Sequence, residues 1–192
     1  RVTAEVMPHH LALTHEWVAG RRRFAGESTV VQGPCPDLNA KVNPPLRTEE
    51  DALALVGAVN DGVFDFMATD HAPHAPRDKD GALSAAAFGM SGLELAIPTM
   101  TRLIDRGMLS WPQVVALFTS RPVSVLNLEG GTLAVGSSAD VTVIDPAREW
   151  TVSEDILRTR SKNTPLIGMT LRGRAVMTIT GGEVRHDELS IR

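Results

Sequence analysis

The chain lacks the features of a disulfide-stabilised, membrane-spanning or nucleic-acid-binding protein. A single cysteine, Cys35, among 192 residues excludes an internal disulfide framework and is compatible with a reducing cytoplasm. No apolar run approaches the roughly 20 residues of a membrane-spanning helix. The 19 Lys and Arg and the 23 Asp and Glu give a net charge of −4, and no basic stripe with interleaved aromatics is present. We therefore expect a cytoplasmic protein that binds neither membranes nor nucleic acid.

The size of the chain and its first residues bear on how it is organised. Its 192 residues are 43% hydrophobic, enough for one full core or two small ones. There is no secretory signal peptide and no starting methionine, and Arg1–Val6 begins abruptly, as if in the middle of a strand. Because natural domains usually start at a linker or an exposed cap, we expect the C-terminal part of a longer protein.

The most informative segment is the hexapeptide Thr69–His74. It follows an apolar run, Val63–Ala68, which predicts a buried strand. Barrel enzymes place catalytic groups where such a strand ends. Asp70 can bind a metal or move a proton, and His71 and His74 can ligate, donate or change charge near neutral pH. An ordinary polar strand end is the alternative interpretation.

A helix followed directly by a strand leads into this hexapeptide. Thr48, with Asp51 three residues later, resembles a capping box at the start of a helix. Asn60–Gly62 ends that helix, and the strand into Asp70 begins there. An α-then-β unit with a short connection is typical of a parallel α/β barrel. We therefore expect an α/β fold, with the C-terminal part of a TIM-like (β/α)8 barrel in the first part of the chain.

The pattern changes near residue 128. Before it, we expect helices over Leu93–Arg106, after an N-cap at Ser110, and over Pro122–Leu126. After it, the pattern predicts short strands over Gly131–Leu133 and Ala139–Asp145 and a hairpin of Leu171–Thr180 with Glu183–Arg185. We therefore expect a partial barrel over residues 1–128 and a small β-rich domain over residues 129–192.

Two segments have less definite patterns. Gly20–Pro36 is rich in Gly, Arg, Ser and Pro and has no period, so it predicts an irregular loop, either an insertion or a mobile lid. The alternating, β-branched segment Val2–Val6 predicts a strand that delivers His9 and His10 to a loop. Adjacent strand residues point to opposite faces and cannot easily bind one ion, so we expect packing or orienting roles for this pair.

The hexapeptide Thr69–His74 resembles the signature of the dihydroorotase family of cyclic amidohydrolases. Other segments resemble the same family in the same order, namely Glu5–Leu11, Lys41–Arg47, Phe88–Glu94 and Asn163–Gly168. The resemblance runs from about Val2 to about Val184. Ala72–His74 favours this branch, because the related hydantoinases and allantoinases usually carry a different sequence after the aspartate.

The resemblance implies a zinc enzyme that reversibly hydrolyses dihydroorotate to N-carbamoyl-L-aspartate in pyrimidine biosynthesis. Opening a cyclic amide requires an activated water and a polarised carbonyl, and a bound metal supplies both. A carboxylate then accepts the proton of the water and passes it to the leaving nitrogen. The resemblance assigns both roles, metal ligand and base, to Asp70, in a site with one or two zinc ions.

The resemblance also implies four substrate-binding residues. Asn43 precedes two prolines in extended chain, and its amide can both donate to and accept from an imide-like ring edge. His74 matches a histidine that contacts the substrate carboxylate or ring. Phe88 and Gly89 match the place where loop backbone contacts the bound ring, and a glycine there allows close approach. A turn asparagine, a supporting histidine and a flexible loop glycine are the alternatives from the residues alone.

The ligand set that the resemblance implies is incomplete in this chain. A zinc site needs about four ligands per ion. In the family, most of these ligands lie on earlier barrel strands. They are a His-x-His pair, a bridging carboxylate or carboxylated lysine, and two further histidines. The chain contains no His-x-His, and the substrate-binding arginine that follows that pair in the family is also absent. We expect the chain alone to be inactive, with most zinc ligands supplied by an N-terminal half. The resemblance further implies a homodimer and leaves open an association with aspartate transcarbamoylase.

Two other functions remain open from the sequence. The first is another cyclic amidohydrolase activity, of the hydantoinase or allantoinase type. The second is a non-catalytic, dihydroorotase-like partner of aspartate transcarbamoylase. Asp70, Asn43 and His74 occur together here, and this argues against the non-catalytic reading because a scaffold does not need that set.

Overall fold

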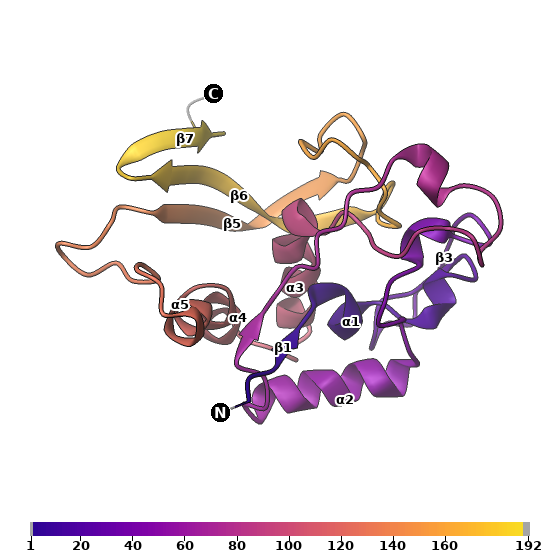
Figure 1. Cartoon of the computed structure of the whole chain (residues 1–192), viewed down its shortest axis with the longest axis horizontal. Helices are drawn as coiled ribbons and strands as arrows, with labels where there is room; N and C mark the ends of the chain where they lie inside the picture. The colour runs from indigo at the N-terminus through magenta and orange to yellow at the C-terminus, as the bar shows by residue number, and fades with distance from the viewer. Residues whose placement is uncertain (1, 190–192) are drawn as a thin grey trace.

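The computed structural model describes residues 2–189, which form a mixed α/β structure (Figure 1). Its strands are β1 (Glu5–Val6), β2 (Arg21–Arg22), β3 (Val31–Gln32), β4 (Phe66–Met67), β5 (Val141–Thr151), β6 (Thr170–Thr180) and β7 (Glu183–Asp187). Its α-helices are α1 (Pro8–Ala12), α2 (Glu49–Asn60), α3 (Ala96–Asp105), α4 (Trp111–Phe118) and α5 (Ser120–Leu126). Short 3-10 helices cover η1 (His15–Trp17), η2 (Leu38–Ala40), η3 (Pro76–Lys79) and η4 (Leu93–Leu95).

Strands β1 and β4 lie side by side as a short parallel pair near the middle of the molecule. Glu5 is opposite Phe66 and Val6 is opposite Met67. Helices α2, α3 and α4 surround this pair and bury one apolar cluster with it, made of Val6, Leu11, Val56, Val59, Met67, Met100, Leu103, Leu109, Val114 and Leu117. Parallel strands need a crossover connection, and α2 supplies the long element of the crossover here.

Side-chain caps start two of these helices as the sequence predicts. The Oγ1 of Thr48 accepts a hydrogen bond from the backbone N–H of Asp51 at 3.2 Å, and the Asp51 carboxylate accepts from the Thr48 N–H at 3.1 Å. At α4, the Ser110 N–H donates to Oε1 of Gln113 at 2.9 Å. Each pair satisfies backbone donors that the first helical turn leaves without partners, so these helix starts are confirmed.

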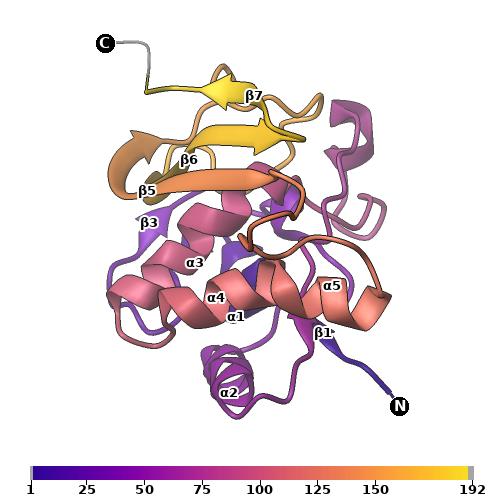
Figure 2. The same ribbon diagram turned by 90° about the vertical axis from the view of Figure 1, so that its left-hand side faces the viewer.

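The last part of the chain is the antiparallel sheet β5–β6–β7, which lies over α3 on one side of the molecule (Figure 2). The predicted hairpin is confirmed, with Gly181 and Gly182 as the turn between β6 and β7. Helix α3 packs against β6, where a Cβ at Gly173 would lie 2.3 Å from Oγ1 of Thr101. The glycine therefore allows the sheet to approach the helix closely.

A second apolar cluster joins the sheet region to the N-terminal region. Its members from both regions include Ala12, Leu13, Trp17, Phe24, Val42, Met90, Leu95, Val152, Leu157, Leu166 and Leu171. Residues on both sides of position 128 therefore share one core. The division into 1–128 and 129–192 stays a prediction.

The structure corrects several local expectations. Gly20–Pro36 is not wholly irregular, because β2 and β3 pair within it, and the Arg22 guanidinium forms a 2.9 Å ion pair with the buried Asp37. The run Val63–Ala68 forms only a two-residue strand, and Val63 is 59% exposed. The predicted strand over Gly131–Leu133 is absent.

The placement of the two adjacent histidines was also wrong. His9 and His10 lie in helix α1, and their ring centroids are 4.3 Å apart. The helix follows β1 directly, because Pro8 occupies its first turn and fixes φ there. None of the helices formed by residues 2–189 has the length and apolar character that crossing a membrane requires.

Candidate active site

Asp70 occupies an unusual position just beyond the end of β4. Its backbone has φ of +48°, in the left-handed region that non-glycine residues seldom adopt. The residue is half-buried, and its carboxylate has no hydrogen bond or ion pair within residues 2–189. Backbone strain of this kind costs on the order of 1 kcal/mol and is concentrated at functional sites. A strained position that presents an unpaired carboxylate is therefore the natural centre of a candidate active site.

His74, Phe88 and Gly89 come together beside this segment. The Nε2 of His74 lies 2.8 Å from the carbonyl oxygen of Phe88, so that ring nitrogen carries the proton and donates. A Cβ added to Gly89 would lie 2.4 Å from the Cβ of Ala72 and 3.2 Å from Nε2 of His74. Gly89 also has φ of +123°. Only glycine allows the two segments to approach this closely.

The backbone groups of this loop are not equally available to a ligand. The Gly89 N–H donates to Lys41 O at 2.9 Å. The Gly89 carbonyl accepts from Nζ of Lys79 at 2.8 Å and from Nδ2 of Asn163 at 3.3 Å. The Phe88 N–H, in contrast, has no partner in the part of the chain that the structure describes. Phe88 therefore offers a free backbone N–H donor, and Gly89 allows the loop to pack closely against Ala72.

Asn43 lies on a neighbouring segment. It is exposed, and its side chain makes no hydrogen bond with any other residue between 2 and 189. Two bonds fix its segment, from the Gly89 N–H to Lys41 O and from Nε2 of His10 to Pro44 O at 2.8 Å. The structure thus brings the Asn43 segment alongside Phe88–Gly89, with the Asn43 amide itself free.

A buried asparagine that the sequence analysis did not single out connects these parts. Asn163 is 6% exposed. Its Oδ1 accepts from the backbone N–H of His74 at 3.0 Å and from Oγ of Ser91 at 2.9 Å. Its Nδ2 donates to Ala72 O at 3.0 Å, in addition to Gly89 O. Asn163 lies in a segment that resembles the family, so the signal was present, but the residue type alone suggested no role.

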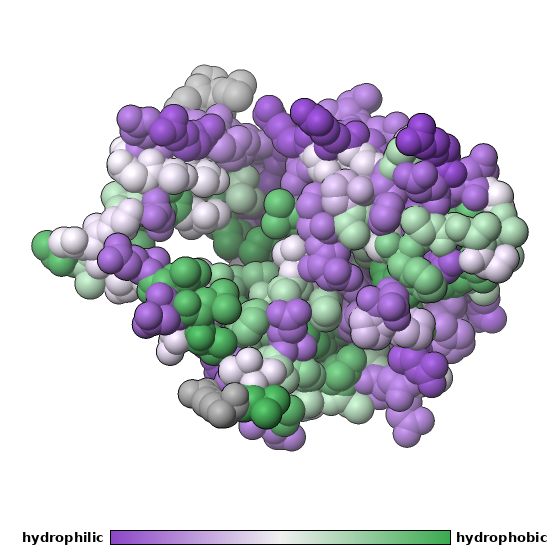
Figure 3. Space-filling model, viewed as in Figure 1, coloured by the Kyte–Doolittle hydropathy of each residue, from purple (hydrophilic) through white to green (hydrophobic). Residues whose placement is uncertain are grey.

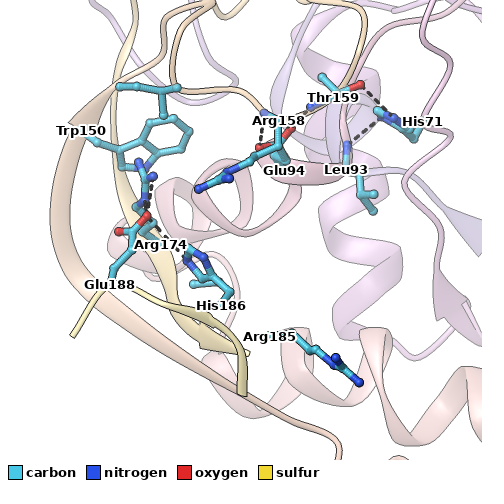
Figure 4. A pocket seen from close by; sticks show the side chains of 12 residues that line it. His71, Leu93, Glu94, Trp150, Arg158, Thr159, Arg174, Arg185, His186 and Glu188 are labelled. Carbon is cyan, nitrogen blue, oxygen red and sulfur yellow. Dashed lines mark hydrogen bonds and ion pairs between the residues drawn. The ribbon is translucent and has the colours of Figure 1, made fainter. Parts of the chain in front are cut away.

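His71 joins two other segments. Its Nδ1 lies 3.2 Å from both the Gly92 N–H and the Leu93 N–H and accepts from them, and its Nε2 lies 3.4 Å from Oγ1 of Thr159. The ring lines a cavity of about 530 Å³, across from the sheet residues Trp150 and His186 (Figure 4). The two acidic residues in that cavity already have partners, since Glu94 accepts from backbone N–H groups and Glu188 pairs with Arg174 at 2.7 Å.

His9 is the most strongly perturbed imidazole near the site. It is 4% exposed, and its Nε2 is buried with no hydrogen-bond partner within residues 2–189. Burial, together with the nearby His10 ring, lowers the pKa of His9 from 6.5 to about 3. His9 is therefore neutral at physiological pH, and it lines a narrow space with Thr69 and Ser91.

The donor set of the site is too small for a complete metal centre within the described residues. Across residues 2–189, no three His, Cys, Asp or Glu side chains are close enough together to hold an ion. The free Asp70 carboxylate suits a divalent cation, but a zinc ion needs about four ligands. The described residues therefore fit one ligand position of such a centre and do not form the centre themselves.

The sequence and the fold match one family of hydrolases. The chain belongs to the amidohydrolase family, whose model matches residues 6–185. Curated relatives that it resembles include the dihydroorotase of Geobacter sp. (strain M21), at 42% identity over 184 residues, and that of Geobacillus sp. (strain WCH70), at 42% identity over 185 residues. These matches cover 96% of this chain and 40% of each relative, so the chain spans about 40% of their length. The predicted family resemblance is thus confirmed.

Solved structures support the fold class. An L-hydantoinase from Arthrobacter aurescens superposes with a TM-score of 0.83 and 26% identity, covering 97% of this chain and 40% of that chain. A D-hydantoinase structure, with a TM-score of 0.81 and 24% identity over 97% of this chain, shows the same fold. The predicted fold class, an α/β part of a hydrolase barrel with β-rich structure after it, is confirmed.

Proposed function

We propose that the protein is a dihydroorotase, which reversibly hydrolyses dihydroorotate to N-carbamoyl-L-aspartate in the cytoplasmic synthesis of pyrimidines. The observation that carries the proposal is the Asp70 carboxylate, which is unpaired, half-buried and held in strained backbone at the end of β4. The 42% identity to dihydroorotases over 96% of the chain supports the choice of reaction.

In this proposal Asp70 moves the proton of the reaction. A carboxylate with no internal partner can accept the proton of the attacking water and deliver it to the ring nitrogen that leaves. Asp70 also serves as one ligand of a zinc centre with one or two ions. When bound, zinc acidifies water and polarises the substrate carbonyl. The remaining ligands are expected from outside these 192 residues, because the described part offers a single one.

Three groups are available to hold the substrate. The Nε2 of His74 bonds Phe88 O, and its Nδ1 has no partner within residues 2–189, so the Nδ1 edge of the ring is open to the substrate. The free Phe88 N–H can donate to a ring carbonyl. The Asn43 amide can pair with the imide edge of the ring. Gly89 lets this backbone pack against Ala72, and we propose that it contributes to substrate binding by allowing this close packing.

A second candidate function is hydantoinase-type hydrolysis of another cyclic amide. The likeness to the L-hydantoinase of Arthrobacter aurescens, at 26% identity, favours it. Both activities need Asp70, but hydantoin and allantoin lack the carboxylate that dihydroorotate would present to His74. We propose a homodimer as the working form, and an association with aspartate transcarbamoylase stays a further proposal.

The test uses the complete gene product that carries this sequence, loaded with zinc. Hydrolysis of dihydroorotate, hydantoin and allantoin is measured side by side, and dihydroorotate is expected to be preferred. Asp70→Asn should lower kcat by at least about 10²-fold. Asp61→Asn, at the exposed end of α2, is the matched control and should retain activity. Activity of Asp70→Asn within a few-fold of the parent would disprove the assigned role. Absence of hydrolysis, with co-purification of a transcarbamoylase, would favour the non-catalytic reading.

A further inference from the structure

Lys79 is a buried cation held by carbonyl oxygens alone. It ends η3 and is 9% exposed. Its Nζ donates to Ala87 O at 2.8 Å, to Gly89 O at 2.8 Å and to Lys41 O at 3.3 Å. The carbonyls use all three N–H donors of the ammonium, and no carboxylate bonds to it within residues 2–189. Burying a charge without a counter-ion is costly, so retaining it calls for an explanation beyond stability.

The bonds of Lys79 fix two peptide units near Phe88, namely Ala87–Phe88 and Gly89–Met90. Ala87 O precedes Phe88 and Gly89 O follows it, so one ammonium holds the two carbonyls that flank the free Phe88 N–H. The third bond, to Lys41 O, connects the loop to the segment that leads into Asn43. Lys79 itself is too deeply buried to contact a ligand in the open part of the site.

A second lysine holds the same loop from outside. Nζ of Lys41 donates to Ser84 O at 3.3 Å and to Ala86 O at 2.5 Å, and it lies 4.2 Å from the centroid of the Phe88 ring. The loop from Ser84 to Gly89 is built of small and apolar residues and has no charge of its own. Two lysines from other segments therefore supply the interactions that define its shape.

We propose that Lys79 is a positioning residue, which sets the Phe88–Gly89 backbone in the conformation that receives the substrate ring. The inference rests on the proposed function for the identity of the substrate. It assigns Lys79 no part in proton transfer, because the ammonium reaches only backbone oxygens.

The protonation state of Lys79 gives the inference a distinctive consequence. Burial, and to a lesser extent the Lys41 ammonium, lowers the pKa of Lys79 from 10.5 to about 8, while Asp37 acts in the opposite direction. A neutral amine has two N–H donors in place of three, so one carbonyl loses its partner above pH 8. The loop should then relax, and KM should rise with pH in that range.

The test compares variants of the complete gene product loaded with zinc. Lys79→Met should raise the KM for dihydroorotate roughly tenfold, as for loss of one charge-assisted hydrogen bond, with a smaller change in kcat. It should also abolish the rise of KM above pH 8. Lys162→Met is the matched control, because Lys162 also donates to carbonyls, those of Leu157 and Thr159, and to none in the loop from Ser84 to Gly89. Lys79→Gln, which keeps two N–H donors, serves if the methionine variant does not fold.

Hydrogen exchange of the backbone separates this inference from the proposed function. In Lys79→Met the Gly89 N–H, which donates to Lys41 O, should exchange at least tenfold faster than in the parent, with or without substrate turnover. Faster exchange in a protein that does not hydrolyse dihydroorotate would reject the proposed function and keep the positioning role. Unchanged exchange, or an unchanged KM and pH profile in an active variant, would overturn the positioning role.

Discussion

The Oδ1 of Asn163 accepts a hydrogen bond from the backbone N–H of His74 at 3.0 Å, although the two residues lie 89 positions apart along the chain. The same amide bonds Ala72, Gly89 and Ser91, so one buried group joins the hexapeptide after β4 to the loop that contains Phe88. The segments that present His74 and Phe88 therefore depend on a residue in the segment that precedes β6. The site is held from a part of the chain that does not take part in its chemistry.

Removing the Asn163 amide should destabilise the protein and loosen the site. Asn163→Ala removes the partners of Ala72 O and of the His74 N–H, while Ser91 Oγ keeps its bond to Ser161 O. We expect a loss of about 2–4 kcal/mol in the free energy of unfolding. Asn163→Asp should be no better, because its second oxygen faces the carbonyls of Ala72 and Gly89. Urea unfolding measures the effect, with Asn39→Ala, at a partly exposed asparagine, as comparison. A loss below 1 kcal/mol in both variants would contradict the role given to this amide.

His74 should act in binding more than in turnover. His74→Ala removes the ring that bonds Phe88 O and presents Nδ1 to a carboxylate, so KM for dihydroorotate should rise about tenfold with a smaller effect on kcat. Steady-state kinetics on the zinc-loaded gene product provides the measurement. His15→Ala, an exposed histidine on η1, should leave both constants unchanged. An equal fall in kcat and kcat/KM would instead place His74 among the groups that act in the transition state.

Two glycines with positive φ, Gly89 and Gly81, allow the cost of steric crowding to be measured separately from the cost of backbone strain. Gly89 has φ of +123° and a Cβ would lie 2.4 Å from Ala72, whereas Gly81 has φ of +83° with nothing within 4 Å. Gly81→Ala should cost only about 1 kcal/mol of backbone strain. Gly89→Ala should cost at least about 2 kcal/mol more, because the Ala72 or Phe88 segment must move. Thermal unfolding of both variants measures the difference, and equal costs would show that close packing at Gly89 is unimportant.

The elements that the sequence predicted well carry their own local signals. Thr48 and Asp51 form the cap of α2 within a single turn, and the Gly181–Gly182 turn fixes the hairpin of β6 and β7. The family resemblance identified His74 and Phe88 because each lies in a short segment whose sequence resembles the family. In each of these cases the information lies within a few consecutive residues.

Contacts between distant residues could not be predicted in this way. Lys79 lies between exposed charged residues, Asp78 and Asp80, and no local pattern distinguishes it as the buried one. The Arg22–Asp37 ion pair orders a segment whose composition suggested an irregular loop. The pairing of these groups depends on which segments meet in three dimensions, and that information is not periodic in the sequence.

The buried neutral His9 should make the protein sensitive to acid. The unfolded chain binds a proton at His9 below its ordinary pKa of 6.5, whereas the folded protein resists protonation until about pH 3, so stability falls as pH decreases through this range. At pH 5 this single group should lower the free energy of unfolding by about 2 kcal/mol relative to pH 7.5. Urea unfolding at the two pH values measures the difference. His9→Gln should abolish that part of the pH dependence, while His15→Gln, on an exposed histidine, should retain it. An undiminished loss in His9→Gln would assign the acid sensitivity to other groups.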